Sequence, residues 1–222
     1  MKKSMCEEIQ SELAKRAVVA VLVIDDARDA VPVAQALVKG GITAIELALR
    51  TEAAPSAIKE IHDNVPEMMI GIGTVIKTGQ ARMVKDLGAD FAVSPGFNPR
   101  ILQEAIACGL PFAPGISTAS ELELAYEQGC DFLKLFPAGP LGGIPYFKAM
   151  AGPYSYLGIN FFPLGGVSED TLSEWASLKN VLSVGGSWIA PTNLIKEKQY
   201  EEITRRAEKA IKIWNDTKRG LK

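Results

Sequence analysis

Short apolar runs recur along the whole chain, and their regular spacing constrains the fold more than any other feature of the sequence. Eight such runs follow one another at intervals of about 20 to 27 residues, the length of one strand and one helix together. The predicted strands are Val18–Ile24, Thr43–Leu47, Met69–Gly73, Phe91–Ser94, Pro111–Ile116, Asp131–Phe136, Asn160–Leu164 and Val181–Val184. Apolar residues at helical spacing between them predict helices. These are Ala27–Lys39, Ala54–Asn64, Gln80–Leu87, Pro99–Cys108, Thr118–Gln128 and Tyr200–Lys218.

Strands that alternate with helices are typical of an α/β protein with a parallel sheet. Eight of them fit a closed (β/α)8 TIM barrel, which we expect to form one domain over residues 1–222. A short amphipathic helix within Met1–Lys15 precedes the first strand. The alternative is an open Rossmann sheet, but its G-x-G-x-x-G/A fingerprint is missing after the first strand. Its nearest approach, Gly71-Ile-Gly73, has no third glycine, so the pattern favours the barrel.

The charged residues and the cysteines exclude several classes of function. Twenty-four Lys and Arg against 26 Asp and Glu give a net charge of −2, so we expect no nucleic-acid or membrane partner. His62 is the only histidine, which excludes a zinc or iron site built on two or three imidazoles of one chain. Cys6, Cys108 and Cys130 are scattered and form no C-x-x-C pair, which is typical of reduced thiols. We therefore expect a cytoplasmic protein without a metal or another cofactor.

Two strands carry a charged residue among apolar neighbours. Lys134 lies between Phe132 and Phe136, and Glu46 lies between Ala44 and Ala48. Because side chains alternate along a strand, the small or aromatic neighbours of the same parity indicate that both charged groups point into the barrel. A buried lysine is costly unless it is paired or gives up its proton, and a neutral amine can attack a ketone to form an imine.

The alternative interpretation of these two residues is structural. Lys134 and Glu46 could form an ion pair that only fixes the register of the strands. Arg50 adds a second cation near Glu46, which is more charge than one ion pair needs. The excess therefore favours a site that binds and transforms an anion.

Paired glycines follow the last two predicted strands. They are Gly165-Gly166 and Gly185-Gly186, the second pair followed by Ser187. Glycine lets backbone N–H groups approach an oxyanion closely, and barrels commonly bind phosphate after strands 7 and 8. One glycine pair alone is typical of a turn, but two pairs in these two loops favour a phosphate site.

Seven short motifs follow one another along the chain. They are Gly-Gly-Ile-Thr-Ala-Ile-Glu46-Leu-Ala-Leu-Arg50-Thr, Gly71-Ile-Gly-Thr74-Val, Ser94-Pro95-Gly96, Pro114-Gly115-Ile-Ser-Thr, Phe132-Leu-Lys134-Leu-Phe-Pro137, Gly165-Gly166-Val-Ser and Gly185-Gly186-Ser187-Trp188. In this order they resemble the class I 2-keto-3-deoxy-6-phosphogluconate (KDPG) aldolases, and the likeness extends from about Val18 to Trp188. The resemblance implies a (β/α)8 barrel, a homotrimer, and cleavage of KDPG into pyruvate and glyceraldehyde 3-phosphate.

The resemblance also implies a role for each matching residue. Lys134 stands at the Schiff-base position, and Glu46 at the position of the residue that moves protons, partly through a water. The remaining matches concern substrate binding. Arg50 and Thr74 match contacts to the pyruvate carboxylate, Pro95 and Phe136 match apolar walls, and Gly165, Gly166, Gly186 and Ser187 match the phosphate end.

The chemistry of the residues agrees with these implied roles. Breaking the C3–C4 bond of a 2-keto acid leaves a carbanion beside the carbonyl carbon, and an imine at Lys134 would delocalise it as an enamine. Glu46 could take the C4 hydroxyl proton and return a proton to C3.

The sequence leaves the substrate open. Leu164 stands where many KDPG aldolases carry threonine, so a hydroxyl near the middle of the substrate is missing. The alternatives are the 6-phosphogalactonate epimer of KDPG and 4-hydroxy-2-oxoglutarate (KHG), which yields pyruvate and glyoxylate. A different class also stays open: a phosphosugar-binding barrel without lyase activity, or an isomerase that uses Glu46 alone.

Overall fold

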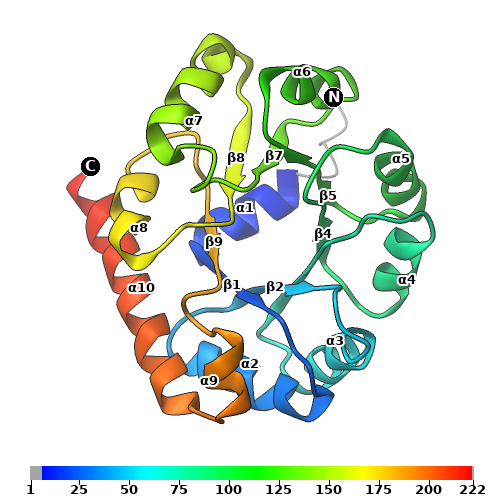
Figure 1. Ribbon diagram of the computed structural model, residues 1–222, viewed down its shortest axis with the longest axis vertical. Helices are drawn as coiled ribbons and strands as arrows, with labels where there is room; N and C mark the ends of the chain where they lie inside the picture. The colour runs from blue at the N-terminus through cyan, green and yellow to red at the C-terminus, as the bar shows by residue number, and fades with distance from the viewer. Residues whose placement is uncertain (1–6, 222) are drawn as a thin grey trace.

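The structure is a computed structural model that describes residues 7–221. Its strands lie in the middle of the molecule and its longer helices surround them (Figure 1). The strands are β1 Val18–Leu22, β2 Ala44–Ala48, β3 Met69–Gly73, β4 Phe91–Val93, β5 Phe112–Ala113, β6 Gly115–Ile116, β7 Phe132–Leu135, β8 Asn160–Pro163 and β9 Val184–Gly186. The α-helices are α1 Glu7–Arg16, α2 Ala30–Lys39, α3 Ala54–Asn64, α4 Gln80–Asp86, α5 Pro99–Cys108, α6 Ala119–Glu127, α7 Gly143–Ala151, α8 Glu169–Ala176, α9 Thr192–Lys196 and α10 Tyr200–Gly220.

The strands form two parallel sheets. The first has the order β5-β4-β3-β2-β1-β9, and the second has the order β6-β7-β8. Pro114 separates β5 from β6 within the predicted strand Pro111–Ile116, because proline has no N–H to donate to a ladder. A single bridge between Phe161 and Val181 joins the second sheet to the chain that leads into β9. The predicted α/β class is confirmed, whereas one continuous eight-stranded barrel is not resolved.

The last strand begins later than predicted. We expected Val181–Val184, but β9 runs from Val184 to Gly186 and pairs with β1. Gly185 and Gly186 stay within this ladder because their φ angles are not positive, whereas Gly165 and Gly166 turn the chain at φ +78° and +83°. The second glycine pair therefore ends a strand rather than following it.

Most predicted helices occur, with small shifts at their ends. The bounds of α3 and α5 are confirmed, and Thr118 caps α6 in a reciprocal pair with Glu121. A 3-10 turn, Ala27–Asp29, precedes α2, because Pro32 has no N–H for the first helical turns. The helices α7, α8 and α9 were not predicted. Residues 1–6 of the predicted N-terminal helix lie outside the described residues, and no helix within 7–221 is long and apolar enough to cross a membrane.

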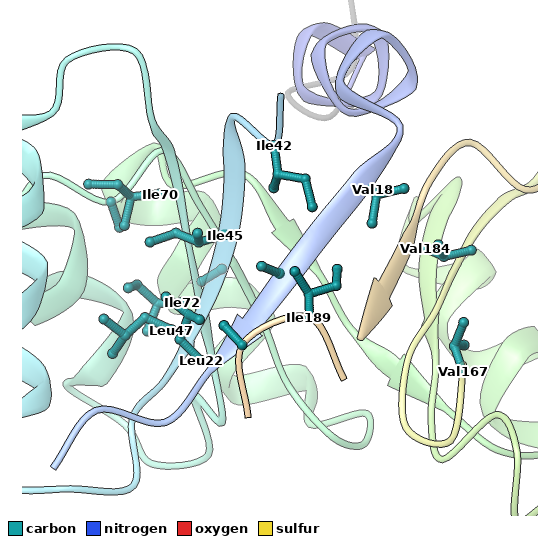
Figure 2. Packing of buried hydrophobic residues seen from close by; sticks show 14 of the residues in the cluster. Val18, Leu22, Ile42, Ile45, Leu47, Ile70, Ile72, Val167, Val184 and Ile189 are labelled. Carbon is teal, nitrogen blue, oxygen red and sulfur yellow. The ribbon is translucent and has the colours of Figure 1, made fainter. Parts of the chain in front are cut away.

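Alternating strand residues separate two apolar layers, as the sequence predicted. Ile45 and Leu47 face the helices, where they meet Ile70 and Ile72 of the neighbouring strand (Figure 2). The residues of opposite parity form a second cluster inside the curve of the strands. It contains Leu13, Val19, Ala44, Met69, Phe91, Val93, Ala113, Phe132, Phe162 and Leu164. The interior is thus packed with side chains and is not a channel.

Helix α1 closes one end of this interior. Leu13 is fully buried in the inner cluster. Gln10 donates to the Asp131 carboxylate over 2.9 Å and accepts from the Asn160 side-chain amide over 2.8 Å, and these partners stand at the beginnings of β7 and β8. Because α1 covers the N-terminal ends of the strands, the opposite, C-terminal ends remain for a site.

Candidate active site

Lys134 of β7 and Glu46 of β2 meet inside the molecule. Their side chains are 5% and 2% exposed, and Lys134 Nζ lies 3.2 Å from Glu46 Oε1 and 3.3 Å from Oε2. The two strands belong to different sheets, so the pair spans the interior. The inward direction predicted for both residues is confirmed. Each charge compensates the other where water is excluded.

Gly73, at the end of β3, makes room for the Glu46 carboxylate. A Cβ atom at position 73 would lie 1.7 Å from Glu46 Oε1, so no side chain is compatible with this placement. This role of Gly73 was not predicted from the sequence. Its signal was available, because a glycine in a strand often marks the close approach of another group.

Phe136 forms one wall beside Lys134. Lys134 Nζ lies 5.0 Å from the centre of its ring, within the range of a cation–π contact. Ser117 Oγ donates to the Phe136 carbonyl over 2.8 Å, which holds the backbone that follows β7. On the other side the ring borders Gly165, where a Cβ would lie 2.8 Å from it.

Arg50 and Thr74 lie together at the C-terminal ends of β2 and β3. Arg50 Nε donates to Thr74 Oγ1 over 3.2 Å. Thr74 has a φ of +65°, which is uncommon for a residue other than glycine and is often found at functional sites. The remaining N–H groups of the Arg50 guanidinium can donate hydrogen bonds to a planar carboxylate.

Glu46, Arg50 and Lys134 border one cavity of about 300 Å³ at the C-terminal ends of the strands. Its size suits a small ligand. The predicted residues that line it are Glu46, Arg50, Lys134, Phe136, Gly165, Gly166, Gly186 and Ser187. Leu164 also lines it, together with five residues that the sequence analysis did not select. These are Val21, Val23, Val167, Pro191 and Thr192.

Two predicted contact residues do not line this cavity themselves. Thr74 is connected to it through Arg50. Pro95 packs its backbone against Gly115, where a Cβ would lie 2.4 Å from the Pro95 carbonyl carbon. Gly115 is the register partner of Lys134, so the Pro95 backbone lies on the side of β6 toward which the Lys134 side chain also points. Larger hollows of about 570 and 790 Å³ lie elsewhere, and neither is lined by Lys134.

The glycine loops form the far end of the cavity. Gly165 and Gly166 adopt left-handed conformations, and Gly166 packs closely against Gly139, which donates its N–H to the Gly165 carbonyl over 2.7 Å. Helix α8 begins just after this loop, and Gly186 and Ser187 border the same end. Left-handed glycines beside a helix N-terminus leave backbone N–H groups available to an anion.

The charges of the cavity suit an anionic ligand. Lys134 and Arg50 bring two cations and Glu46 brings one anion, although the whole chain carries −2. Within residues 7–221, no three His, Cys, Asp or Glu side chains are grouped so that they could hold a metal ion. The geometry offers a buried amine, a carboxylate that can move protons, and donors at both ends of the cavity.

Comparison with known protein families identifies the family to which this chain is similar. The family model described as "KDPG and KHG aldolase" matches residues 9–206. The chain belongs to this family. It is therefore an aldolase, a carbon–carbon lyase, and the resemblance found in the sequence is confirmed.

Individual relatives are similar in sequence to this aldolase over most of their length. The KHG/KDPG aldolase of Escherichia coli is 41% identical over 202 residues, which cover 91% of this chain and 94% of the relative. The 2-dehydro-3-deoxy-phosphogluconate aldolase of Dickeya dadantii is 43% identical, with 87% and 90% covered. A KDPG aldolase structure from Legionella pneumophila, in which pyruvate is captured as a covalent carbinolamine, superposes with a TM-score of 0.84. It is 37% identical, with 90% of this chain and 96% of that chain covered.

Proposed function

We propose that this aldolase cleaves KDPG into pyruvate and glyceraldehyde 3-phosphate through a Schiff base on Lys134. The observation that carries the proposal is the buried Lys134–Glu46 pair, which stands in a cavity between Arg50 and the glycine loops. The names of the relatives support the same reaction, the cleavage step of the Entner–Doudoroff pathway.

The first step forms the imine. The neutral amine of Lys134 attacks the C2 carbonyl, and the carbon–oxygen double bond opens to a carbinolamine. Loss of the C2 hydroxyl as water then gives the protonated imine. Glu46, within 3.3 Å of the amine, is placed to receive the ammonium proton and to return it to the departing hydroxyl.

The second step breaks the C3–C4 bond. Glu46 takes the proton of the C4 hydroxyl, the bonding electrons flow into the imine, and glyceraldehyde 3-phosphate leaves. The enamine that remains receives a proton at C3, and water hydrolyses the imine to release pyruvate and Lys134. One carboxylate serves all these transfers because its partner changes between steps.

The two ends of the cavity orient the substrate. Arg50, held by Thr74, is the proposed partner of the carboxylate next to the reacting carbonyl. The glycine loops and Ser187 are the proposed partners of the phosphate. Phe136 borders the imine, and Pro95, next to Gly115 of β6, stays a predicted wall residue.

A second candidate substrate is KHG. Leu164, Val21 and Val167 give the cavity an apolar wall. These three side chains offer no hydroxyl to a sugar acid, so we expect weak discrimination at C4. The Escherichia coli relative carries both substrates in its name. The galactonate epimer of KDPG is open for the same reason.

Pyruvate release, coupled to lactate dehydrogenase, tests the substrate assignment. We expect the highest kcat/KM on KDPG, with lower values on the galactonate epimer and on KHG. Replacing Ser187 with Ala should lower kcat/KM on KDPG by about three- to tenfold, the effect of one lost hydrogen bond, and should leave KHG unaffected. A preference for KHG over KDPG would contradict the KDPG assignment, and an absence of pyruvate from all three would favour the isomerase or binding alternative.

We further propose that the two sheets form one (β/α)8 barrel within a single domain. Only Pro114 separates β5 from β6, and its carbonyl accepts from Lys134 N over 2.9 Å, so the ladder continues across the break. At the other seam, Leu182 N donates to the Phe161 carbonyl over 3.3 Å. Both contacts support closure of the ring.

A homotrimer in the cytoplasm completes the proposal. Large apolar side chains are exposed on neighbouring helices, among them Ile106 on α5 and Leu124 and Tyr126 on α6, at 53%, 52% and 40%. An interface between copies would remove this surface from water. We expect light scattering after gel filtration to give three times the chain mass of 23.9 kDa, and a monomeric mass would contradict the trimer.

A further inference from the structure

The segment that closes the phosphate end of the cavity leaves the ladder with β1 after Gly186, the last residue of β9. Gly185 and Gly186 lack side chains, and Ser187 is exposed. Glycines lose more backbone freedom than any other residue when they become ordered. A chain of this kind binds an anion well only if other parts of the molecule fix its conformation beforehand.

Trp188 provides one such constraint from outside the cavity. Its indole ring covers Gly186, because a Cβ at position 186 would lie 1.5 Å from the ring. The Trp188 carbonyl accepts a hydrogen bond from Arg206 Nη1 over 2.8 Å. Trp188, which directly follows Ser187, therefore contacts Gly186 through its ring and is held by a hydrogen bond to its backbone carbonyl.

Arg206 is itself held in one orientation. Its Nε donates to Glu202 Oε1 over 2.7 Å, one turn earlier on α10. Arg205 and Arg206 lower the pKa of Glu202 to about 2, so this carboxylate stays ionised at every pH at which an enzyme assay is run. With its planar guanidinium shared between Glu202 and Trp188, Arg206 has little freedom left.

Helix α10 is a firm support for this contact. Thr204 Oγ1 donates to the Ala36 carbonyl of α2 over 2.9 Å, and a Cβ at Gly40 would lie 2.5 Å from that of Ala207. The helix runs along the outside of the molecule beside α2 and α8 (Figure 1). Lys209 also reaches Glu169, the first residue of α8, over 2.6 Å. One helix thus contacts the segments that follow both glycine loops.

We propose that Arg206 is a positioning residue for the phosphate end of the site. It touches no substrate, and it holds Gly186 and Ser187 through the Trp188 backbone so that a phosphate meets them in a fixed conformation. This role rests on the proposed function, because it assumes that the phosphate binds between the glycine loops. The prediction is specific: Arg206 affects phosphate affinity and leaves the chemistry at Lys134 unchanged.

The test compares Arg206→Ala with two further variants. Arg205→Ala is the matched control, because it removes the same charge from a residue whose side-chain hydrogen bonds go to the same Glu202. Arg206→Lys keeps a cationic donor for the Trp188 carbonyl. Calorimetry measures the Kd of inorganic phosphate for each protein, and the coupled assay measures kcat and KM on KDPG and on KHG.

For Arg206→Ala we expect both the phosphate Kd and the KM for KDPG to rise about tenfold, as for one lost hydrogen bond to a charged donor. Its kcat and its constants on KHG should stay close to those of the unchanged protein. Arg205→Ala should match the unchanged protein in every constant, and Arg206→Lys should recover most of the affinity.

Equal effects of Arg206→Ala and Arg205→Ala would overturn the proposal, as would an equal loss on KDPG and KHG. Phosphate that does not bind to the unchanged protein would overturn it too. Failure of the proposed function gives a different result: no pyruvate from KDPG, with phosphate binding that still depends on Arg206.

Discussion

Lys134 shows how a single residue can be costly to the fold and necessary to the site. Its side chain is 5% exposed, and its amine has Glu46 as its ionic partner among the described residues. Removing one member of such a pair leaves the other buried without compensation, at a cost of about 3–5 kcal/mol. We therefore expect substitutions at either position to lower stability as well as activity, and readouts that separate the two are needed.

Gly73 tests the position of Glu46 without removing either charge of the pair, because its effect on Glu46 is steric. In Gly73→Ala the new methyl group would overlap the Glu46 carboxylate, which must move away from Lys134. We expect kcat on KDPG to fall by about a hundredfold, the lower range for a displaced general acid–base.

Gly96→Ala is the matched control for this prediction. A Cβ at position 96 meets no atom within 4 Å, so kcat should be nearly unchanged. Equal kcat values for the two variants would contradict the role given to Gly73.

At the scale of elements, α1 matters because it closes the interior opposite the site. Leu13 supplies its buried apolar contact to the inner cluster, and Gln10 ties it to β7 and β8. The aromatic rings of Phe132 and Phe162 stack in the same layer, with centroids 6.3 Å apart. Loss of α1 would expose this layer to water. Phe132 of this layer lies only two residues from Lys134 on β7.

Leu13→Ala tests the contribution of this helix. The truncation leaves a cavity in a packed layer, so we expect the free energy of unfolding, measured in urea, to fall by about 2–5 kcal/mol. Glu8→Ala, on the exposed side of α1, should change it by less than about 0.5 kcal/mol. A Leu13→Ala protein as stable as Glu8→Ala would show that α1 does not support the interior.

The elements that sequence could and could not predict differ for physical reasons. Most strands and the helices α3, α5 and α6 carry clear apolar periodicity or a capping pair, and they occur close to the predicted bounds. Helix α7 begins at the second of two left-handed glycines, Gly142 and Gly143, and contains Pro145, so its sequence indicates a loop. The late start of β9 depends on pairing with β1, which a local pattern does not contain.

The site shows the same division. Parity within two strands was enough to bring Lys134 and Glu46 together, because the period of a strand is fixed. The close approach of Gly73 to Glu46 joins neighbouring strands through their three-dimensional register, and the contact of Arg206 with Trp188 joins a distant helix to a loop. Neither has a signal at one position of the sequence that specifies its partner.

At the scale of the whole molecule, a chain of net charge −2 can bind a substrate with two anionic groups if its positive potential is gathered locally. Lys134 and Arg50 collect positive charge at one end of the cavity, and backbone N–H groups are available at the other. The closed interior, with α1 at one end, leaves the C-terminal ends of the strands as the entrance. Every step of the proposed reaction then depends on a covalent bond to one lysine.

Trapping that bond tests the central claim most directly. The protein is incubated with pyruvate, reduced with borohydride and analysed by mass spectrometry, together with Lys134→Ala and with Lys148→Ala, which replaces an exposed lysine of α7. The account predicts one pyruvate-derived adduct on the peptide that contains Lys134, retained in Lys148→Ala and lost in Lys134→Ala. Absence of an adduct from the protein with its natural sequence would contradict this prediction, as would an adduct that persists in Lys134→Ala.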